Sequence, residues 1–356
     1  MIRITKRAEL PRVKGMIIQV VAILLSLVFA GIVIFAMGFN PIRVFTEIIN
    51  GSIGTQMRLN QTILRTIPIV ITSMGILVAF KMKFWNIGGE GQIMMGAMGA
   101  TFVALNFPTD MPNLLTLLLM AIAAMLCGGF WAFIPAYFKG KFGTNEVIFT
   151  LMMNYIAILW VTFLQHDLWR SEAYMGFPRM ASFTQNALLP RVLGFHAGWI
   201  IAIVAVIFVY IFINHTKKGY EISVLGESME TARYAGMNTR SIMIVAMLIS
   251  GGLCGLTGMV QVSGVERTLT YATSAGIGFT AIITTWLGRL SAPVIVIVCF
   301  IFAMLLQGGT FLQLAIQVPA AVAQMLQGTI LFFVLGSEFF TQYKVSLSRN
   351  AKKEVA

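Results

Sequence analysis

One short segment brings a carboxylate, two amides and several glycines to the start of a mostly apolar run. In residues 86–92, Asn86, Glu90 and Gln92 are interleaved with glycines, and the sequence stays largely apolar to residue 106. A carboxylate near membrane depth is costly, so it normally faces protein or water and often serves transport. The structural alternative is a helix start in which Asn86 caps the first turn and Glu90 complements the helix dipole. Both interpretations stay open from the residues alone.

Other neutral polar and aromatic side chains lie inside further apolar runs. They offer hydrogen bonds and stacking faces without full charges, which favours an uncharged polar solute over an ion. Each of them could instead hydrogen-bond only between helices, a contact worth about 0.6 kcal/mol on average. The candidate pathway residues are Asn86, Glu90, Gln92, Asn154, Gln261, Phe279, Thr280 and Gln307, with Trp286 as a second stacking ring.

The segment 216–240 is the most polar stretch between two apolar runs. Ser228 is predicted to cap a short helix, Ala232 and Ala235 to form its small face, and Gly236 to end it. A short rigid helix at the membrane surface is a suitable lever for a partner protein, although an ordinary surface helix is the alternative. The candidate coupling residues are Gly226, Glu227, Ser228, Ala232, Arg233, Ala235 and Gly236.

Catalytic and metal chemistry find no support in the residue pattern. The sequence contains no Gly-x-x-x-x-Gly-Lys-Ser/Thr loop, so any ATP must be used by another chain. The three histidines are scattered, and the three cysteines lie inside apolar runs without metal-ligand spacing. We therefore predict no catalytic residues, no metal site and no cofactor bound by this chain.

The composition identifies the solvent of this chain as lipid. Hydrophobic residues make up 58% of its 356 residues and charged residues 11%, with a mean hydropathy of +0.85. A soluble domain carries about a quarter charged residues. The formal net charge of +12 does not indicate nucleic acid, because the basic residues are dispersed among the gaps between apolar runs. The expected fold class is an all-α polytopic membrane protein.

About ten transmembrane helices are expected from runs of roughly 20 apolar residues. The predicted spans are 16–39, 63–80, 86–106, 113–137, 145–165, 196–213, 241–262, 272–288, 292–314 and 317–336. The spans 63–80 and 272–288 are the shortest. The run that begins at residue 16 is too long for a removable signal sequence.

The distribution of basic residues predicts the orientation. With a cytoplasmic N-terminus, 18 of the 25 Lys and Arg residues lie on the cytoplasmic side and 7 outside, as the positive-inside rule expects. Residues 1–15 and 337–356 are then cytoplasmic, and 16–336 form the membrane domain with the coupling segment 216–240. Spans two to five and seven to ten begin on opposite sides, which predicts two inverted four-helix halves plus peripheral helices.

Three motifs carry a family resemblance. The segment 86–92, Asn-Ile-Gly-Gly-Glu-Gly-Gln, resembles the signature of permeases of branched-chain amino acid and simple-sugar importers, and is closest in form to the nucleoside permeases that work with a basic membrane lipoprotein. The segment 143–157 is similar to a second motif of that subgroup. Residues 276–282, followed by Leu-Gly-Arg-Leu at 287–290, are similar to a third.

This resemblance implies a bacterial cytoplasmic-membrane importer subunit, with both termini cytoplasmic. Its partners would be an ATP-binding-cassette ATPase docked on 216–240, a second related permease in a heterodimer, a substrate-binding lipoprotein and membrane lipid, and no nucleic acid. Ser228 and Met229 stand where the family usually has Asn-Pro. The expected solute is a purine nucleoside. The alternatives are a simple sugar or an amino acid in the same importer class, or an ion-driven secondary transporter.

Overall fold

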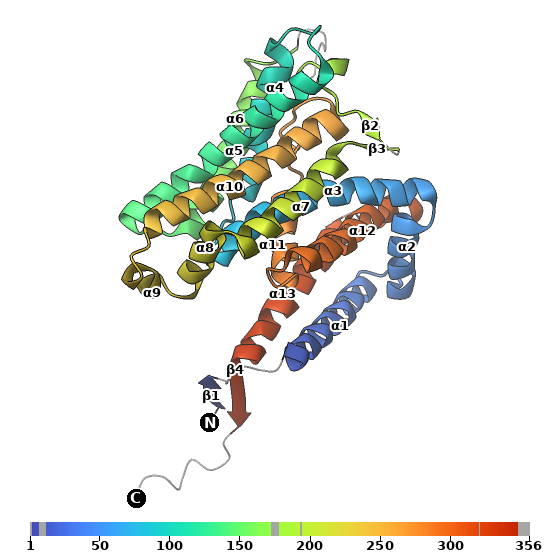
Figure 1. Cartoon of the computed structure of the whole chain (residues 1–356). Helices are drawn as coiled ribbons and strands as arrows, with labels where there is room; N and C mark the ends of the chain where they lie inside the picture. The colour runs from blue at the N-terminus through green and yellow to red at the C-terminus, as the bar shows by residue number, and fades with distance from the viewer. Residues whose placement is uncertain (1, 7–11, 172–177, 193, 320, 348–356) are drawn as a thin grey trace, which may run out of the picture. The chain divides into compact units, whose positions relative to one another are not determined.

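The computed structural model describes residues 2–6, 12–171, 178–192, 194–319 and 321–347. The chain divides into two compact units. Unit 1 comprises Met1–Leu59 and Met304–Ala356, and unit 2 comprises Asn60–Ala303 (Figure 1). The helices α3 (Gln56–Lys81) and α12 (Ala292–Ile316) each contribute to both units.

Unit 1 pairs the two ends of the chain. Helix α1 (Arg12–Ala36) packs against α13 (Ala321–Gln342) around a core that includes Ala30, Ile34 and Leu326. The strands β1 (Ile2–Lys6) and β4 (Tyr343–Leu347) are antiparallel, with Ile2 opposite Leu347. The paired strands place residues 2–6 beside residues 343–347.

A helix that was not predicted follows α1. Helix α2 (Pro41–Ile53) is bent by 112° from the preceding helix. Asn40 caps it by accepting hydrogen bonds from the N–H groups of Ile42 and Arg43, and Pro41 takes the first helical position, where a missing N–H costs nothing.

Unit 2 is built around the helices α4, α5 and α10. Its long elements are α4 (Gly89–Asn106), α5 (Asn113–Phe142), α6 (Glu146–His166), α7 (Gly198–His215) and α10 (Thr239–Val260), the last continued by the π-helical turn η2 (Gln261–Glu266). Its short elements are η1 (Gln185–Ala187), β2 (Arg191–Val192), β3 (Phe195–His196), α8 (Lys217–Glu227), α9 (Met229–Tyr234) and α11 (Ile277–Leu287).

Small residues let the central helices approach closely. A Cβ atom added to Gly96 of α4 would lie 2.2 Å from the Cα of Gly255 in α10, and one added to Gly255 would lie 2.2 Å from the carbonyl oxygen of Ala124 in α5. Close backbone contact of this kind is how helices associate in a lipid medium, where burial of apolar surface gives little driving force.

The all-α membrane class is confirmed, but the count of ten spans is not. Within the described residues, six helices are long and apolar enough to cross, or seven if α1 and α2 are counted as one bent span. The short prediction 63–80 became the 26-residue α3. The prediction 272–288 became α11, whose 11 residues extend only about 16 Å against a hydrocarbon core of about 30 Å. Helix α4 is helical as predicted, but its glycines and polar first turn leave it outside the six.

Candidate functional site

Glu90 joins the starts of two helices that are far apart in the sequence. Its Oε1 accepts a hydrogen bond from the N–H of Gly276 at 2.7 Å, and its Oε2 accepts one from the N–H of Gly278 at 2.8 Å. Glu90 lies in the first turn of α4, whereas Gly276 is the N-cap of α11. The positive ends of two helix dipoles thus meet at one buried carboxylate, which is stabilising for the negative charge.

The loop before α11 is bent into position by unusual backbone conformations. Arg267, Ala275 and Gly276 have positive φ angles of 60°, 43° and 79°. Left-handed residues stop a helix and turn the chain, so α11 begins only at Ile277. These turns bring the N–H groups of Gly276 and Gly278 to Glu90.

Buried side chains fasten the same loop. Glu266 accepts hydrogen bonds from the hydroxyls of Thr273 at 2.7 Å and Thr270 at 3.3 Å. The predicted pathway residue Gln261 donates to the backbone oxygen of Thr273 at 3.4 Å. Gln165, which was not predicted, accepts from the N–H of Tyr271 at 3.0 Å. Gln261 therefore braces the turn that leads to α11.

Asn86 and Gln92 form a reciprocal amide pair. Asn86 Nδ2 donates to Gln92 Oε1 at 3.2 Å, and Gln92 Nε2 donates to Asn86 Oδ1 at 3.0 Å. Asn86 also donates to the hydroxyl of Ser250 and accepts from the N–H of Gly88. Asn86 and Gln92 are almost completely buried, at 0% and 1% exposure. Asn86 thus braces the turn before α4, although it lies two residues before Gly88, which is the N-cap.

Helix α6 clamps the same turn from the other side. Asn154 donates to the carbonyl of Ile87 at 2.9 Å and accepts from the N–H of Gly91 at 2.8 Å. The hydroxyl of Thr150, one turn earlier, accepts from the N–H of Ile87. Thr150 and Ser250 were missed from sequence, yet each is a polar residue inside an apolar run, the same signal that identified Asn154.

The structure brings four predicted pathway residues together: Asn86, Glu90, Gln92 and Asn154 surround the start of α4. Thr280 is buried in the first turn of α11, and Phe279 beside it is 44% exposed. Gln307 lies in the α12 part of unit 1 and is not one of this group. A role for any of them in the pathway stays a prediction.

Trp286 does not stand free as a stacking face. Its ring stacks on Trp85 with centroids 5.1 Å apart and lies 5.7 Å from Phe80, in a cluster that joins α11 to α3 and the loop after it. The aromatic side chain that α11 leaves open is therefore Phe279.

The segment 216–240 folds into two short helices, α8 and α9. Ser228 accepts a hydrogen bond from the N–H of Thr231 at 3.2 Å and so caps α9, as predicted, and Gly236 follows with a φ of 73°. Ala232 is fully buried and Ala235 is exposed, so only Ala232 of the two predicted small residues packs against the protein. The reason is that α9 spans only six residues, and Ala235 is already its C-cap.

The two short helices are anchored on unit 2 and present an exposed edge. Gly226 packs so closely on α3 that a Cβ atom there would lie 2.0 Å from the carbonyl oxygen of Lys81. A cavity of about 300 Å³ lies beside α9, between Met229, Glu227 and the ion pair that Lys139 forms with Glu146 at 2.6 Å. Glu230, Arg233 and Tyr234 of α9 are exposed. A partner protein could bind this edge without unfolding its base.

Metal chemistry has no site in the part of the chain that the structure describes, where no group of three or more His, Cys, Asp or Glu residues could hold an ion. The hydrogen bonds around the start of α4 come from amides, hydroxyls and backbone N–H groups, and both oxygens of the Glu90 carboxylate accept one.

The known proteins that this chain resembles are transport permeases. A family model described as branched-chain amino acid transport system / permease component matches residues 58–335. The chain is 31% identical over 345 residues to a glucose ABC transporter permease protein of Haloferax volcanii, covering 92% of this chain and 89% of that one. It is 28% identical to a nucleoside ABC transporter permease protein of Lactococcus lactis, with 91% of each chain covered. It is also 28% identical to a guanosine ABC transporter permease protein of Bacillus subtilis, with 92% of this chain and 94% of that one covered. The family match includes both the Glu90 contacts and the segment 216–240.

Proposed function

Since this chain belongs to the branched-chain amino acid transport system permease family, and is the membrane component of an ATP-binding-cassette importer, we propose that its solute is a purine nucleoside. The observation that carries this proposal is Phe279, an exposed aromatic ring in the first turn of α11, next to the buried hydroxyl of Thr280. A ring of this kind stacks on a flat base, and neighbouring hydroxyl and amide groups suit ribose hydroxyls. Two relatives named for nucleosides support the same solute class.

The charges around the start of α4 also favour a neutral solute. Glu90 is the carboxylate that an ion-driven transporter would need, but both its oxygens are occupied by the N–H groups of Gly276 and Gly278. The remaining groups of this cluster are neutral amides and hydroxyls. Both this geometry and the family argue for ATP-driven transport and against ion coupling.

The meeting of α4 and α11 suggests how the pathway is formed. Half-helices whose N-termini point at the solute site are a recurring feature of transporters with inverted repeats. We propose that α4 and α11 occupy corresponding positions in two inverted halves. On the orientation predicted above, α4 would be approached from the cytoplasmic side and α11 from the outer side, and the solute would pass beside the junction at Glu90.

The family implies an ATPase and a substrate-binding partner. We propose that the ATPase docks on α9 through the exposed residues Glu230, Arg233 and Tyr234, so that its closure is transmitted through Gly226 to α3. In this arrangement α9 and both termini face the cytoplasm of a bacterial cell, a lipoprotein delivers the solute from outside, and a second related permease completes a heterodimer.

Reconstitution tests the solute. Vesicles that contain the permease, its sister permease, the ATPase and the lipoprotein should accumulate labelled guanosine or adenosine with ATP, and vesicles with this chain alone should not. The variant Phe279→Leu should weaken uptake, because the leucine fills space but cannot stack, while Phe279→Tyr should retain it. Absence of nucleoside uptake by the complete set would refute the nucleoside assignment.

A simple sugar is the second candidate, favoured by the glucose permease of Haloferax volcanii, which is 31% identical to this chain. Competition for binding to the lipoprotein partner separates the two. If glucose, and no nucleoside, displaces the bound ligand, the importer mechanism stands and the solute is a sugar.

A further inference from the structure

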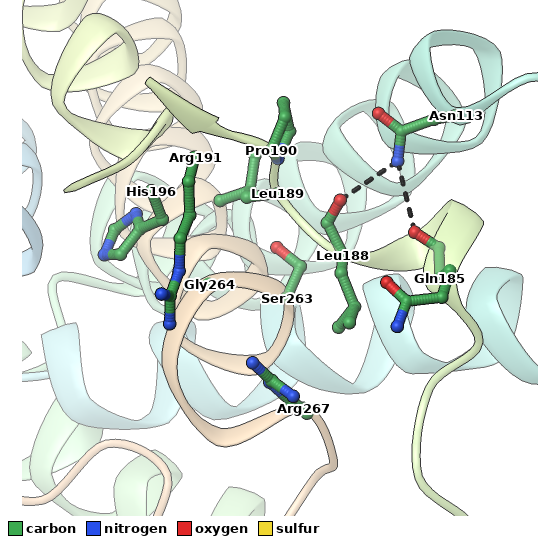
Figure 2. A pocket seen from close by; sticks show the side chains of 10 residues that line it. All are labelled: Asn113, Gln185, Leu188, Leu189, Pro190, Arg191, His196, Ser263, Gly264 and Arg267. Atoms are coloured by element: carbon green, nitrogen blue, oxygen red, sulfur yellow. Dashed lines mark hydrogen bonds between the residues drawn. The ribbon is translucent and has the colours of Figure 1, made fainter. Parts of the chain in front are cut away.

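A cavity of about 370 Å³ lies where three long helices of unit 2 have their ends (Figure 2). Asn113 begins α5, Ser263 lies in η2 at the end of α10, and His196 precedes the first residue of α7 by two positions. Because these three helices are long and apolar enough to cross a membrane, we expect their ends at the depth of the lipid headgroups. The cavity is therefore expected at the membrane surface, on the side predicted to be outer.

The cavity carries two positive charges and no negative one. Arg191 lies in β2, and Arg267 is the residue directly after η2. Figure 2 shows their guanidinium groups extending along the cavity, and no Asp or Glu lines it. Neither arginine forms an ion pair with any residue in the described ranges. Guanidinium groups bind phosphate and carboxylate through paired, parallel hydrogen bonds. An anion is the complementary ligand.

The walls are held in place by hydrogen bonds across the sequence. Asn113 Nδ2 donates to the carbonyl of Asn186 at 2.9 Å and of Leu188 at 3.0 Å. The N–H of Phe183 donates to the carbonyl of Arg267 at 2.8 Å. Arg267 has a left-handed backbone with a φ of 60°, an uncommon conformation for a residue other than glycine. Such a conformation persists where the surrounding structure enforces it.

His196 forms part of the wall without adding charge. Its Nδ1 accepts a hydrogen bond from the N–H of Gly198, so the ring proton is on Nε2. Burial, and then the charge of Arg191, lower the pKa of His196, so the ring is neutral at neutral pH. The positive charge of the cavity therefore comes from the two arginines.

Exposed apolar residues are neighbours in the sequence of three residues that line the cavity. Leu114, Val192 and Val265 are 72%, 36% and 50% exposed. Each follows directly on a lining residue, namely Asn113, Arg191 or Gly264. A basic cavity with exposed apolar residues next to it in the sequence, at the expected depth of the headgroups, matches a molecule that is anionic at one end and apolar along its length.

We propose that this cavity binds the phosphate of an anionic phospholipid headgroup, with Arg191 and Arg267 as the ligands and Leu114, Val192 and Val265 against the acyl chains. The chemistry on the protein side is recognition of a phosphate oxyanion, and the lipid supplies that group at the right depth. The assignment does not depend on which solute the importer carries.

Lipid titration of the purified full-length permease in detergent, followed by native mass spectrometry, tests the proposal. The wild type should bind phosphatidylglycerol in preference to phosphatidylcholine. Arg191→Gln should lower the affinity for phosphatidylglycerol about fivefold, and its combination with Arg267→Asn about 30-fold, taking roughly 1 kcal/mol for each basic residue near a membrane surface. Asparagine is chosen at 267 because it tolerates a left-handed backbone.

Two further variants keep the test falsifiable if the double variant is unstable. Arg179→Gln removes an exposed arginine of the same outer segment that does not line the cavity, and it should leave the lipid preference unchanged. Arg191→Lys keeps the charge but loses the planar fork, and its affinity should fall between those of the wild type and Arg191→Gln.

Three results would overturn the proposal. The first is an unchanged preference for phosphatidylglycerol in Arg191→Gln and in the double variant. The second is displacement of phosphatidylglycerol by inorganic phosphate at comparable concentration, which would make the ligand a free anion. The third is weaker docking of the substrate-binding partner in these variants without any wild-type lipid preference, which would assign the cavity to an acidic side chain of that protein.

Discussion

The carboxylate of Glu90 accepts a hydrogen bond from the backbone N–H of Gly278, 188 positions further along the chain, at 2.8 Å. With the matching bond from Gly276, it fixes the start of α11 against the start of α4. A charged acceptor between two helix N-termini neutralises both dipoles at once. The junction is a small contact between α4 and the short helix α11, so its strength depends strongly on this one side chain.

Replacing Glu90 by glutamine should loosen this junction. The amide keeps one oxygen acceptor but turns an NH₂ group toward the second backbone N–H, which leaves a buried donor without a partner. The free energy of unfolding should fall by about 1–3 kcal/mol. ATP-driven uptake should fall with it, because α11 loses its register on α4. Thermal unfolding in detergent and vesicle uptake measure the two effects.

The same substitution at Glu47 in α2 is a suitable control, because that residue is partly exposed. Gly278→Ala attacks the junction from the other side, since a Cβ atom there would lie 2.4 Å from the backbone nitrogen of Glu90. If both Glu90→Gln and Gly278→Ala have the melting temperature and the uptake rate of the wild type, the junction has no part in stability or transport.

Close packing of α4 on α10 gives a second prediction. Gly96→Ala should destabilise unit 2, because its new methyl group would lie 2.2 Å from the Cα of Gly255. Since this is a backbone atom, the clash can be relieved only if α4 and α10 move apart. Overpacking of this kind costs typically about 1–3 kcal/mol. Gly252→Ala on α10 is the matched control, since its Cβ atom would meet nothing closer than 3.6 Å.

The control should be neutral or slightly stabilising, because alanine is favoured over glycine in a helix by about 1 kcal/mol. Thermal unfolding of the two variants side by side measures the difference. Equal melting temperatures would mean that the contact between Gly96 and Gly255 is not as close as the structure places it.

The sequence predicted the class of the fold and the start of α4, because both depend on local composition. Asn86, Glu90 and Gln92 stand within seven residues, so their helix-start chemistry is visible in one segment. The cap of α9 by Ser228 was predictable for the same reason. Asn40 and Pro41, the cap and first position of α2, are an equally local signal of a helix start, although they lie outside the long apolar runs.

The shortness of α11 could not be predicted in this way. The residues before it are small and apolar enough to continue a span, and Ala275 has no intrinsic preference for the positive φ that it adopts. The turn is held by the nearby Gln261 and Glu266, and also by Gln165 and Glu90, which lie 106 and 186 positions from the residues they bind. Tertiary contacts of this kind leave no local pattern in one sequence.

A third prediction concerns coupling to the ATPase. Ser228→Ala removes the side-chain acceptor that caps α9 and should weaken that six-residue helix, with a cost of about 1 kcal/mol that is typical of a lost N-cap. ATP hydrolysis by the complete importer should then respond less to the solute-loaded lipoprotein. Global thermal unfolding should change little, because α9 is a surface element.

Two control variants accompany this measurement. Ser228→Asp keeps a capping oxygen and should preserve coupling. Thr231→Ala removes an exposed side chain but keeps the backbone N–H that Ser228 caps, so it should also resemble the wild type. A loss of coupling in Thr231→Ala equal to that in Ser228→Ala would show that side-chain contacts, and not the cap, determine docking.

The last prediction is a pH dependence of stability that arises from His196. Burial, and secondarily the charge of Arg191, lower the pKa of this ring in the folded protein below its unfolded value of about 6.5. The unfolded chain therefore binds a proton more readily, so the contribution of His196 to stability is complete above pH ~6.5 and is lost as the pH falls from there through the lowered folded pKa.

His196→Asn keeps an acceptor near the position of Nδ1 for the N–H of Gly198 but does not titrate in this range. The melting temperature of the wild type, measured relative to that of His196→Asn, should decline on acidification below pH ~6.5 and stay constant above it. Since every other titrating group is common to both proteins, parallel curves across that window would mean that His196 is not held neutral in the folded state.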